Sequence, residues 1–230
     1  MALVKLGPMF AEASGKIGGL VAARNRGGAY VREWTKPLVS TSTEALAAKA
    51  RLGAYAQGWA GITANERAAW HSWANGNPVT NRLGETRVLS GHQAYVQLNT
   101  VIDLVGGTPI DVPPVTTAPG ALLTLVFDGD IGAGDFDLTY TATPLAAGIM
   151  LYLRGCQVNS PGIKYVTNLY KHIGVSAAAQ ASPFDIQTLW DARLGAAQVG
   201  QTCHIEVRLV DSLSGLVGPP IRTSVVATST

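Results

Sequence analysis

The sequence predicts a mixed α+β chain in two parts, an N-terminal β-hairpin with a small helical bundle and then a C-terminal all-β sandwich. Two β-compatible runs flank a turn near the N-terminus, capped helical patterns follow, and beyond residue 120 short apolar runs alternate with turn residues. The expected divisions are an N-terminal arm at 1–14, a basic hairpin plus helical domain at 15–105, a Pro-rich linker at 106–120 and a β-sandwich domain at 121–230.

The first part begins with the hairpin, residues 15–34. Short apolar runs lie on either side of a turn made by residues 24–28, and the stretch is rich in glycine and in Lys and Arg. An isolated two-stranded hairpin is marginally stable in water, so this one is expected to pack on the rest of the chain or on a partner. The residues expected to bind that partner are Lys16, Arg24, Arg26, Tyr30, Arg32 and Trp34. Residues 1–14 show no clean period and are interpreted as an arm.

Helical patterns follow the hairpin. Caps at residues 40–44 precede apolar residues at helical spacing, and glycines near residue 60 end that helix. Thr63 and Glu66 form a capping box for a second helix, and Ser90 caps a third that runs to about Val105. Residues 77–89 are read as a polar excursion that could form a second small ribbon. The expected common core of the helices is aromatic: Trp59, Trp70, Trp73 and Tyr95.

The second part has the pattern of a β-sandwich. Residues 106–120 contain four prolines and no apolar period, which predicts a linker. Short strand-like runs then recur with turn signals between them, and the closing pair around the SLSG turn is similar to the last hairpin of a fibronectin type III domain. Residues 183–194 interrupt the strands as a short helix or an edge strand that carries Trp190.

Composition bounds the function. The 230 residues are 47% hydrophobic and only 14% charged, well below the usual quarter. Such a composition fits a subunit covered by its neighbours, and also a small β domain rich in Thr, Ala and Gly. No run of about 18 apolar residues exists, so we expect no membrane span. Together with an N-terminus that lacks the organisation of a secretory signal, this predicts a protein that stays in the cytosol or in a particle assembled there.

The charge is unevenly distributed along the chain. Residues 1–100 contain 11 Lys and Arg against 5 Asp and Glu, a net of +6, whereas residues 101–230 contain 6 against 10, a net of −4. A basic front and an acidic back are typical of two parts with different neighbours.

Four stretches together resemble a group of bacteriophage and prophage structural proteins: GKIGG at 15–19, RGGAYVR at 26–32, WAGITANERAAWHSWA at 59–74 and GHQAYVQLN at 91–99. The resemblance implies a C-terminal immunoglobulin-like or fibronectin-like domain and a virion protein of the capsid cement, or decoration, type. It also implies the major capsid protein and further copies of this chain, as a dimer or trimer, as partners. Three other roles stay open: a phage tail or neck protein, a DNA-associated protein using the basic front half, and an adhesin or carbohydrate-binding sandwich.

No motif predicts catalysis. Gly15-Lys16 lacks the remaining residues of a phosphate-binding loop, and no catalytic nucleophile has a recognisable setting. His71, His92, His172 and His204 are too far apart in sequence to suggest a metal site. The chain is therefore expected not to be an enzyme and to need no cofactor.

A carboxylate-rich loop and the two cysteines complete the candidates. Asp128, Asp130, Asp135 and Asp137 could supply oxygen ligands to calcium, but their spacing matches no EF-hand and an Asp- and Gly-rich β-turn explains them as well. Cys156 and Cys203 are expected in neighbouring strands as buried thiols, with a disulfide as the alternative.

Overall fold

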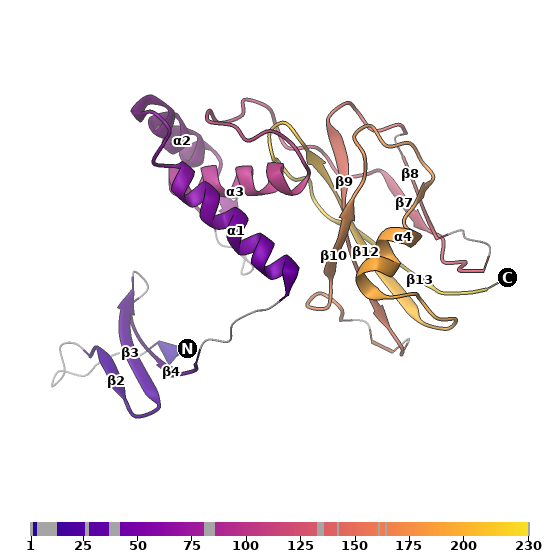
Figure 1. The fold of residues 1–230 in the computed structure, drawn as a ribbon, viewed down its shortest axis with the longest axis horizontal. Helices are drawn as coiled ribbons and strands as arrows, with labels where there is room; N and C mark the ends of the chain where they lie inside the picture. Colours follow the sequence, from indigo (N-terminus) through magenta and orange to yellow (C-terminus); the bar gives the residue numbers. More distant parts are fainter. Residues whose placement is uncertain are drawn as a thin grey trace. The chain divides into compact units, whose positions relative to one another are not determined.

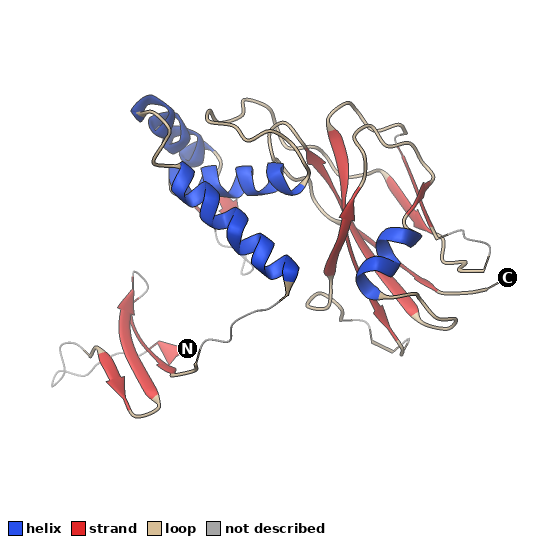
Figure 2. Cartoon of the chain, viewed as in Figure 1, coloured by secondary structure: helices blue, strands red, loops and turns tan. Residues whose placement is uncertain are grey.

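The computed structural model describes residues 2–3, 13–25, 28–36, 42–80, 86–132, 136–141, 143–160, 162–163 and 165–229. The fold is mixed α+β, with four helices and several antiparallel sheets in those residues (Figure 1 and Figure 2). The chain divides into two compact units, residues 1–47 and 48–230. The predicted domain at 15–105 is thereby divided, because its hairpin lies in the first unit and most of its helical part in the second.

The first unit contains a four-stranded antiparallel sheet. Its strands are β1 (Ala2–Leu3), β2 (Gly15–Ile17), β3 (Leu20–Asn25) and β4 (Gly28–Glu33), in the order β1-β4-β3-β2. The predicted hairpin is confirmed as β3 and β4, but the expectation of only two strands was wrong. Gly18, at φ +58°, lets the chain reverse within two residues and add β2. Ala2–Leu3 of the predicted arm pairs with β4, whereas residues 4–12 lie outside the described part.

Three helices begin the rest of the chain: α1 (Thr43–Gly58), α2 (Ala64–Gly76) and α3 (Gly91–Leu104). The predicted capping box of α2 is confirmed, since Thr63 N–H donates to Glu66 Oε2 at 2.6 Å and Glu66 N–H donates to Thr63 Oγ1 at 3.3 Å. Ser90 caps α3 in the same way with Gln93. The small ribbon between α2 and α3 consists of β5 (Val79–Thr80) and β6 (Thr86–Arg87).

The helices pack around the predicted aromatic residues. The ring of Tyr95 lies 5.5 Å from those of both Trp59 and Trp70, centroid to centroid, and Trp73 packs edge-on against Trp70 at 6.0 Å. Trp70 is fully buried and donates its indole N–H to the carbonyl oxygen of Asp111 at 2.7 Å. This bond reaches the irregular segment that follows α3.

That irregular segment, the predicted linker, has no helix or strand, but hydrogen bonds to α3 fix its beginning. The buried Asn99 side chain of α3 accepts from Ile110 N–H at 2.7 Å and donates to Ile110 C=O at 3.0 Å, much as a neighbouring strand would. Nearby, the backbone of Gly107 approaches Ser212, and that of Gly215 approaches Leu98, closely enough that a Cβ on either glycine would overlap a carbonyl oxygen. The helices and the sheets of the second unit therefore meet backbone to backbone.

Two antiparallel sheets form the rest of the second unit. One has the order β10-β9-β12-β13, from β9 (Ile149–Val158), β10 (Lys171–Val175), β12 (Thr202–Asp211) and β13 (Ile221–Val226); the other has the order β11-β8-β7, from β7 (Thr124–Phe127), β8 (Asp137–Thr141) and β11 (Phe184–Asp185). The closing pair β12–β13 is confirmed. The run KYVTNLYKHI was a wrong strand prediction in its first part, because residues 167–169 form a turn and β10 begins at Lys171.

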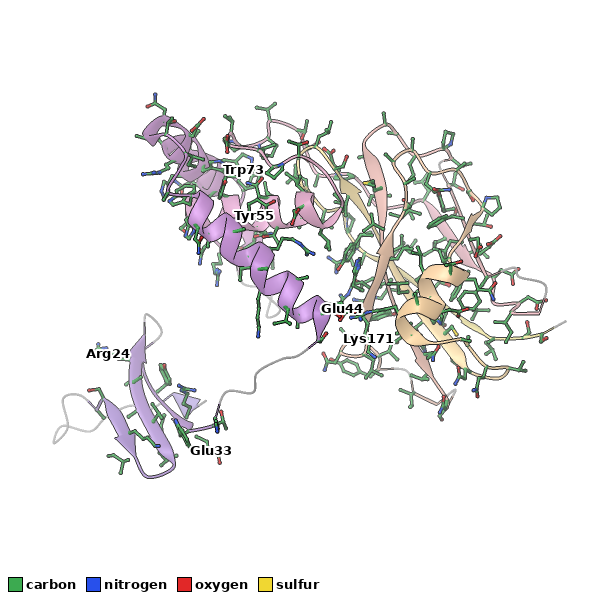
Figure 3. The ribbon with its side chains drawn as sticks, in the orientation of Figure 1. Arg24, Glu33, Glu44, Tyr55, Trp73 and Lys171 are labelled. Atoms are coloured by element: carbon green, nitrogen blue, oxygen red, sulfur yellow. The ribbon has the colours of Figure 1, made fainter. Side chains whose placement is uncertain are left out.

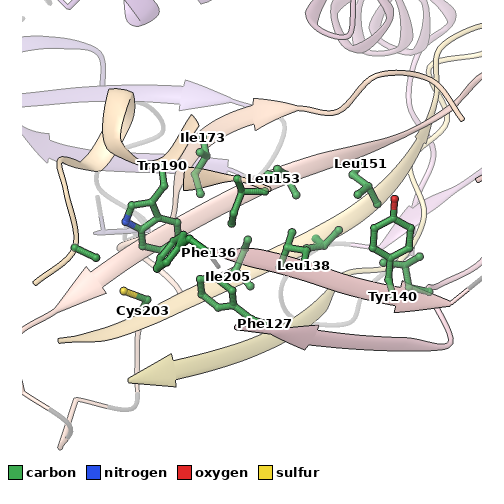
Figure 4. Packing of buried hydrophobic residues seen from close by; sticks show 14 of the residues in the cluster. Phe127, Phe136, Leu138, Tyr140, Leu151, Leu153, Ile173, Trp190, Cys203 and Ile205 are labelled. Carbon is green, nitrogen blue, oxygen red and sulfur yellow. The ribbon is translucent and has the colours of Figure 1, made fainter. Parts of the chain in front are cut away.

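The two sheets share one hydrophobic core (Figure 4). Its aromatic centre is Trp190, on the helix α4 (Gln187–Leu194), with Phe136 at 5.2 Å and Phe127 at 5.8 Å between ring centroids. The predicted interruption thus contains both a short edge strand, β11, and a helix. In the described residues no helix combines the length and the apolarity needed to cross a membrane.

Both cysteines are buried free thiols on adjacent strands of one sheet. Cys203 lies directly opposite Gln157 in the register, one position away from Cys156. Because side chains alternate between faces along a strand, Cys203 points into the core between the sheets and Cys156 points to the other face. The expected buried thiols are confirmed, and burial raises the pKa of the Cys156 thiol to about 11.

Candidate partner-binding surface

The register of the first sheet sorts the predicted partner-binding residues onto two faces. Lys16 lies opposite Val21, which lies opposite Arg32, so all three side chains share a face. Tyr30 is two residues before Arg32 on β4 and shares that face. Arg24, opposite Ala29, belongs to the other face. Arg26 lies outside the described residues.

Trp34 joins the face of Lys16. The ammonium group of Lys16 lies 3.7 Å from the centroid of the Trp34 ring, a cation–π contact. A backbone hydrogen bond fixes the position of Trp34, because the backbone N–H of Trp34 donates to the carbonyl oxygen of Gly19 at 2.7 Å. The structure thus brings together Lys16, Tyr30, Arg32 and Trp34, and separates them from Arg24.

The opposite face is more apolar. Its apolar members lie opposite one another in the register, Ile17 opposite Leu20 and Ala22 opposite Val31. Each pair is one residue along the strands from the basic face, so its side chains point to the other side of the sheet. Ile17 is 83% exposed and Leu20 54%. Arg24 lies at one end of this face and Glu33 at the other, as their separate labels in Figure 3 show.

None of the side chains described at positions 13–36 is buried. Residues of Val and Tyr type on β-strands normally contribute to a core, and here Val21, Tyr30 and Val31 are only partly buried. Among the described strands, β2 also has a neighbour on one side only, so its outer edge offers backbone N–H and C=O groups. The sheet therefore has two means of contact: strand addition at β2 and burial of either face.

The four histidines have different surroundings. His71 accepts a hydrogen bond from Gly91 N–H at 3.2 Å through Nδ1, and both His71 and His92 pack against Trp59. His172 stacks on Tyr152, with centroids 4.8 Å apart and an interplanar angle of 12°. Burial lowers the pKa of His204.

The Asp-rich loop behaves as a turn in its described part. Asp130 Oδ1 accepts from Gly132 N–H at 2.9 Å, which is an Asx-type turn contact. Asp135 lies outside the described residues. Across the part of the chain that the structure describes, no three or more His, Cys, Asp or Glu side chains gather in a way that could hold a metal ion.

A charged cluster on β9, β12 and β13 was missed in the sequence. Glu206 is 1% exposed, and its carboxylate accepts from Arg154 Nη1 at 3.2 Å, Arg208 Nε at 3.2 Å and Arg222 Nε at 2.8 Å. Burial alone would raise the pKa of Glu206, but the hydrogen bond from Arg222 and the charges of all three arginines lower it. The alternation of His204, Glu206 and Arg208 along one strand was a usable signal for a charged face.

No family model matches this chain, and no curated protein matches its sequence.

Proposed function

We propose that the chain is a non-enzymatic structural protein of a tailed bacteriophage, a capsid cement protein that binds and stabilises the lattice of the major capsid protein. The observation that supports it best is the first sheet, whose described side chains include no buried residue and which exposes both apolar and cationic groups. A sheet of this kind gains stability when a partner covers it. The resemblance of residues 15–100 to phage structural proteins is our reason for proposing the major capsid protein as that partner.

The proposed contact uses two kinds of interaction. Strand addition at the outer edge of β2 supplies backbone hydrogen bonds, and the basic face positions the contact through Lys16 and Arg32 against acidic groups of the coat protein. One such sheet binds weakly. Copies of the chain that associate as a dimer or trimer would make the attachment multivalent, since each copy brings its own sheet to the symmetric lattice.

The second unit is proposed to serve as the part that projects from the particle or pairs with another copy. Its two antiparallel sheets with a shared core support an immunoglobulin-like or fibronectin III-like domain, which is the fold we propose for residues 121–230.

Deletion of residues 1–34 tests the proposal. We expect the truncated chain to fold, because no residue of the aromatic helix core or of the sheet core lies in that segment, and to lose binding to empty heads of the phage that carries the gene. The measurement is co-sedimentation with heads that contain no DNA. Binding equal to that of the full chain would overturn the sheet as the anchor.

Charge reversals identify the face in contact. Arg32→Glu changes the basic face and Arg24→Glu the apolar face, whereas Lys49→Glu changes an exposed lysine on α1 as a matched control. We expect Arg32→Glu to weaken co-sedimentation at least tenfold and Lys49→Glu to leave it unchanged. If the full chain instead binds DNA with a steep salt dependence and ignores empty heads, the DNA-associated role is correct. Sedimentation with purified tails rather than heads would indicate the tail or neck role.

A further inference from the structure

A cavity of about 520 Å³ lies between helix α3 and the outer face of the larger sheet of the second unit. Its size is that of a small-molecule site. One side is polar, with Arg154, Arg208, Tyr152 and His172 from three adjacent strands. The other side is mainly apolar, with Val101 and Leu104 beside Gln97 on α3, Val210 on β12, and Val217, which bridges to Val210.

The polar side carries excess positive charge. Three arginines surround the single carboxylate of Glu206, which gives the cluster a net charge of +2. The residues that line the cavity include two of these arginines and no carboxylate. On α3, the carboxylate of Asp103 is paired with Arg51 at 3.0 Å. Burial, together with the charges of Arg193, Arg51 and Arg154, lowers the pKa of His172, so that side chain adds no charge at neutral pH.

The arginines keep donors for a ligand. Arg208 directs Nε and Nη2 to Glu206, which leaves Nη1 without a described acceptor. Arg154 gives Nη1 to Glu206 and Nη2 to the carbonyl oxygen of Tyr170, which leaves Nε. Glu206 receives bonds on both oxygens and holds the two guanidinium groups in place at the cavity, with their side chains about one third exposed. Preorganised guanidinium donors of this kind are well suited to a carboxylate.

From this geometry we propose that the cavity binds a small organic acid, with its carboxylate on Arg208 and Arg154 and its apolar body against Val101, Leu104 and Val210. The apolar wall disfavours inorganic anions, which would leave that surface wet. The site belongs wholly to the second unit and does not depend on the partner-binding role of the first sheet.

Titration of the full chain with four probes, followed by amide NMR shifts, tests the site. Hexanoate is expected to saturate the site and to shift the amide signals of α3, β9 and β12. Acetate keeps the carboxylate but lacks the apolar chain, and hexanol keeps the apolar chain but lacks the negative charge. Inorganic phosphate carries negative charge but has no apolar chain. Each of these three is expected to bind at least tenfold more weakly than hexanoate. Absence of saturable shifts with hexanoate, or equal binding of hexanol or phosphate, would overturn the proposal.

Two arginine variants provide a matched pair. Arg208 and Arg222 both bond to Glu206, but only Arg208 lines the cavity. Arg208→Gln is expected to weaken hexanoate at least tenfold, and Arg222→Gln by less than threefold. Equal losses in the two variants would show that the cavity donors are not the binding groups.

A third variant approaches the site from the helix. Val101→Trp fills the apolar half of the cavity from α3 and leaves the charged cluster unchanged. It is expected to abolish the amide shifts caused by hexanoate, while the amide spectrum still shows that the sheets are folded. Because this variant leaves all three arginines intact, it decides the question even if Arg208→Gln fails to fold. Unchanged hexanoate binding in a folded Val101→Trp chain would place the ligand elsewhere and overturn the proposal.

Discussion

The two units contain the same kinds of residue, but these residues are exposed in the first unit and buried in the second. Trp34 in the first unit is 47% exposed and stacks under a lysine, whereas Trp190 in the second is fully buried among phenylalanines. The first unit has paired strands and turns but no buried side chain at residues 13–24, 29–36 and 42–47, and the second has the same features around a continuous core. Backbone pairing alone therefore gives a sheet its shape, and burial of side chains gives it independent stability.

The largest effect is expected from the buried tryptophan. Trp190→Ala removes a side chain that packs on Phe127 and Phe136, and it should lower the free energy of unfolding of the second unit by about 4 kcal/mol. Urea unfolding followed by far-UV circular dichroism measures it. A loss below about 1 kcal/mol would mean that the shared core of the two sheets does not stabilise this unit.

Glu206→Gln should cost about 3 kcal/mol at pH 7, because three arginines lose their common carboxylate. The folded pKa of Glu206 is lowered relative to its unfolded value, so its contribution is present above the unfolded pKa and is lost as the pH falls through the folded pKa. The difference in the free energy of unfolding between the two chains should therefore be smaller at pH 3 than at pH 7. Glu33→Gln, on the exposed end of β4, is the control and should change neither curve.

Asn99→Leu should cost about 2 kcal/mol, because it leaves the N–H and C=O of Ile110 without their partners. The local readout is hydrogen exchange at the Ile110 amide, which we expect to accelerate at least tenfold. Asn77→Ala removes an exposed bond to the Trp73 carbonyl and serves as the comparison. Unaltered exchange at Ile110 in the Leu variant would show that the bond does not hold the segment.

The smallest effect on stability is expected from Trp34→Ala, at about 0.5 kcal/mol or less, since the ring is half exposed and its cation–π contact lies at the surface. The same variant should weaken binding to empty heads clearly. If Trp34→Ala greatly lowered the free energy of unfolding but left binding to heads unchanged, Trp34 would stabilise the first unit and would not bind the partner.

Local signals in the sequence predicted much of the fold. The capping box at Thr63, the helix cap at Ser90, the pairing of β3 with β4 and the β12–β13 pair depend on residues close in sequence, and the structure confirms each. The first sheet was underestimated because β1 comes from residues 2–3, a pairing set by contacts distant in sequence. The start of β10 was missed because Val166, although buried, lies in an irregular segment before a turn and not in a strand.

The candidate sites were predictable to different degrees. The basic residues of the hairpin stood out by composition, but their division between two faces required the register of β2, which placed Lys16 with Arg32 and apart from Arg24. The cluster around Glu206 draws on three strands separated by up to about 70 residues. A pattern within one strand could show a charged face there, but not that Arg154 and Arg222 would meet the same carboxylate.

The close approaches of Gly107 to Ser212 and of Gly215 to Leu98 have a mechanical consequence. At these two points main chain touches main chain, so no long side chain separates the two segments there. A pull applied at the far end of the sheets would reach the helices with little stretch.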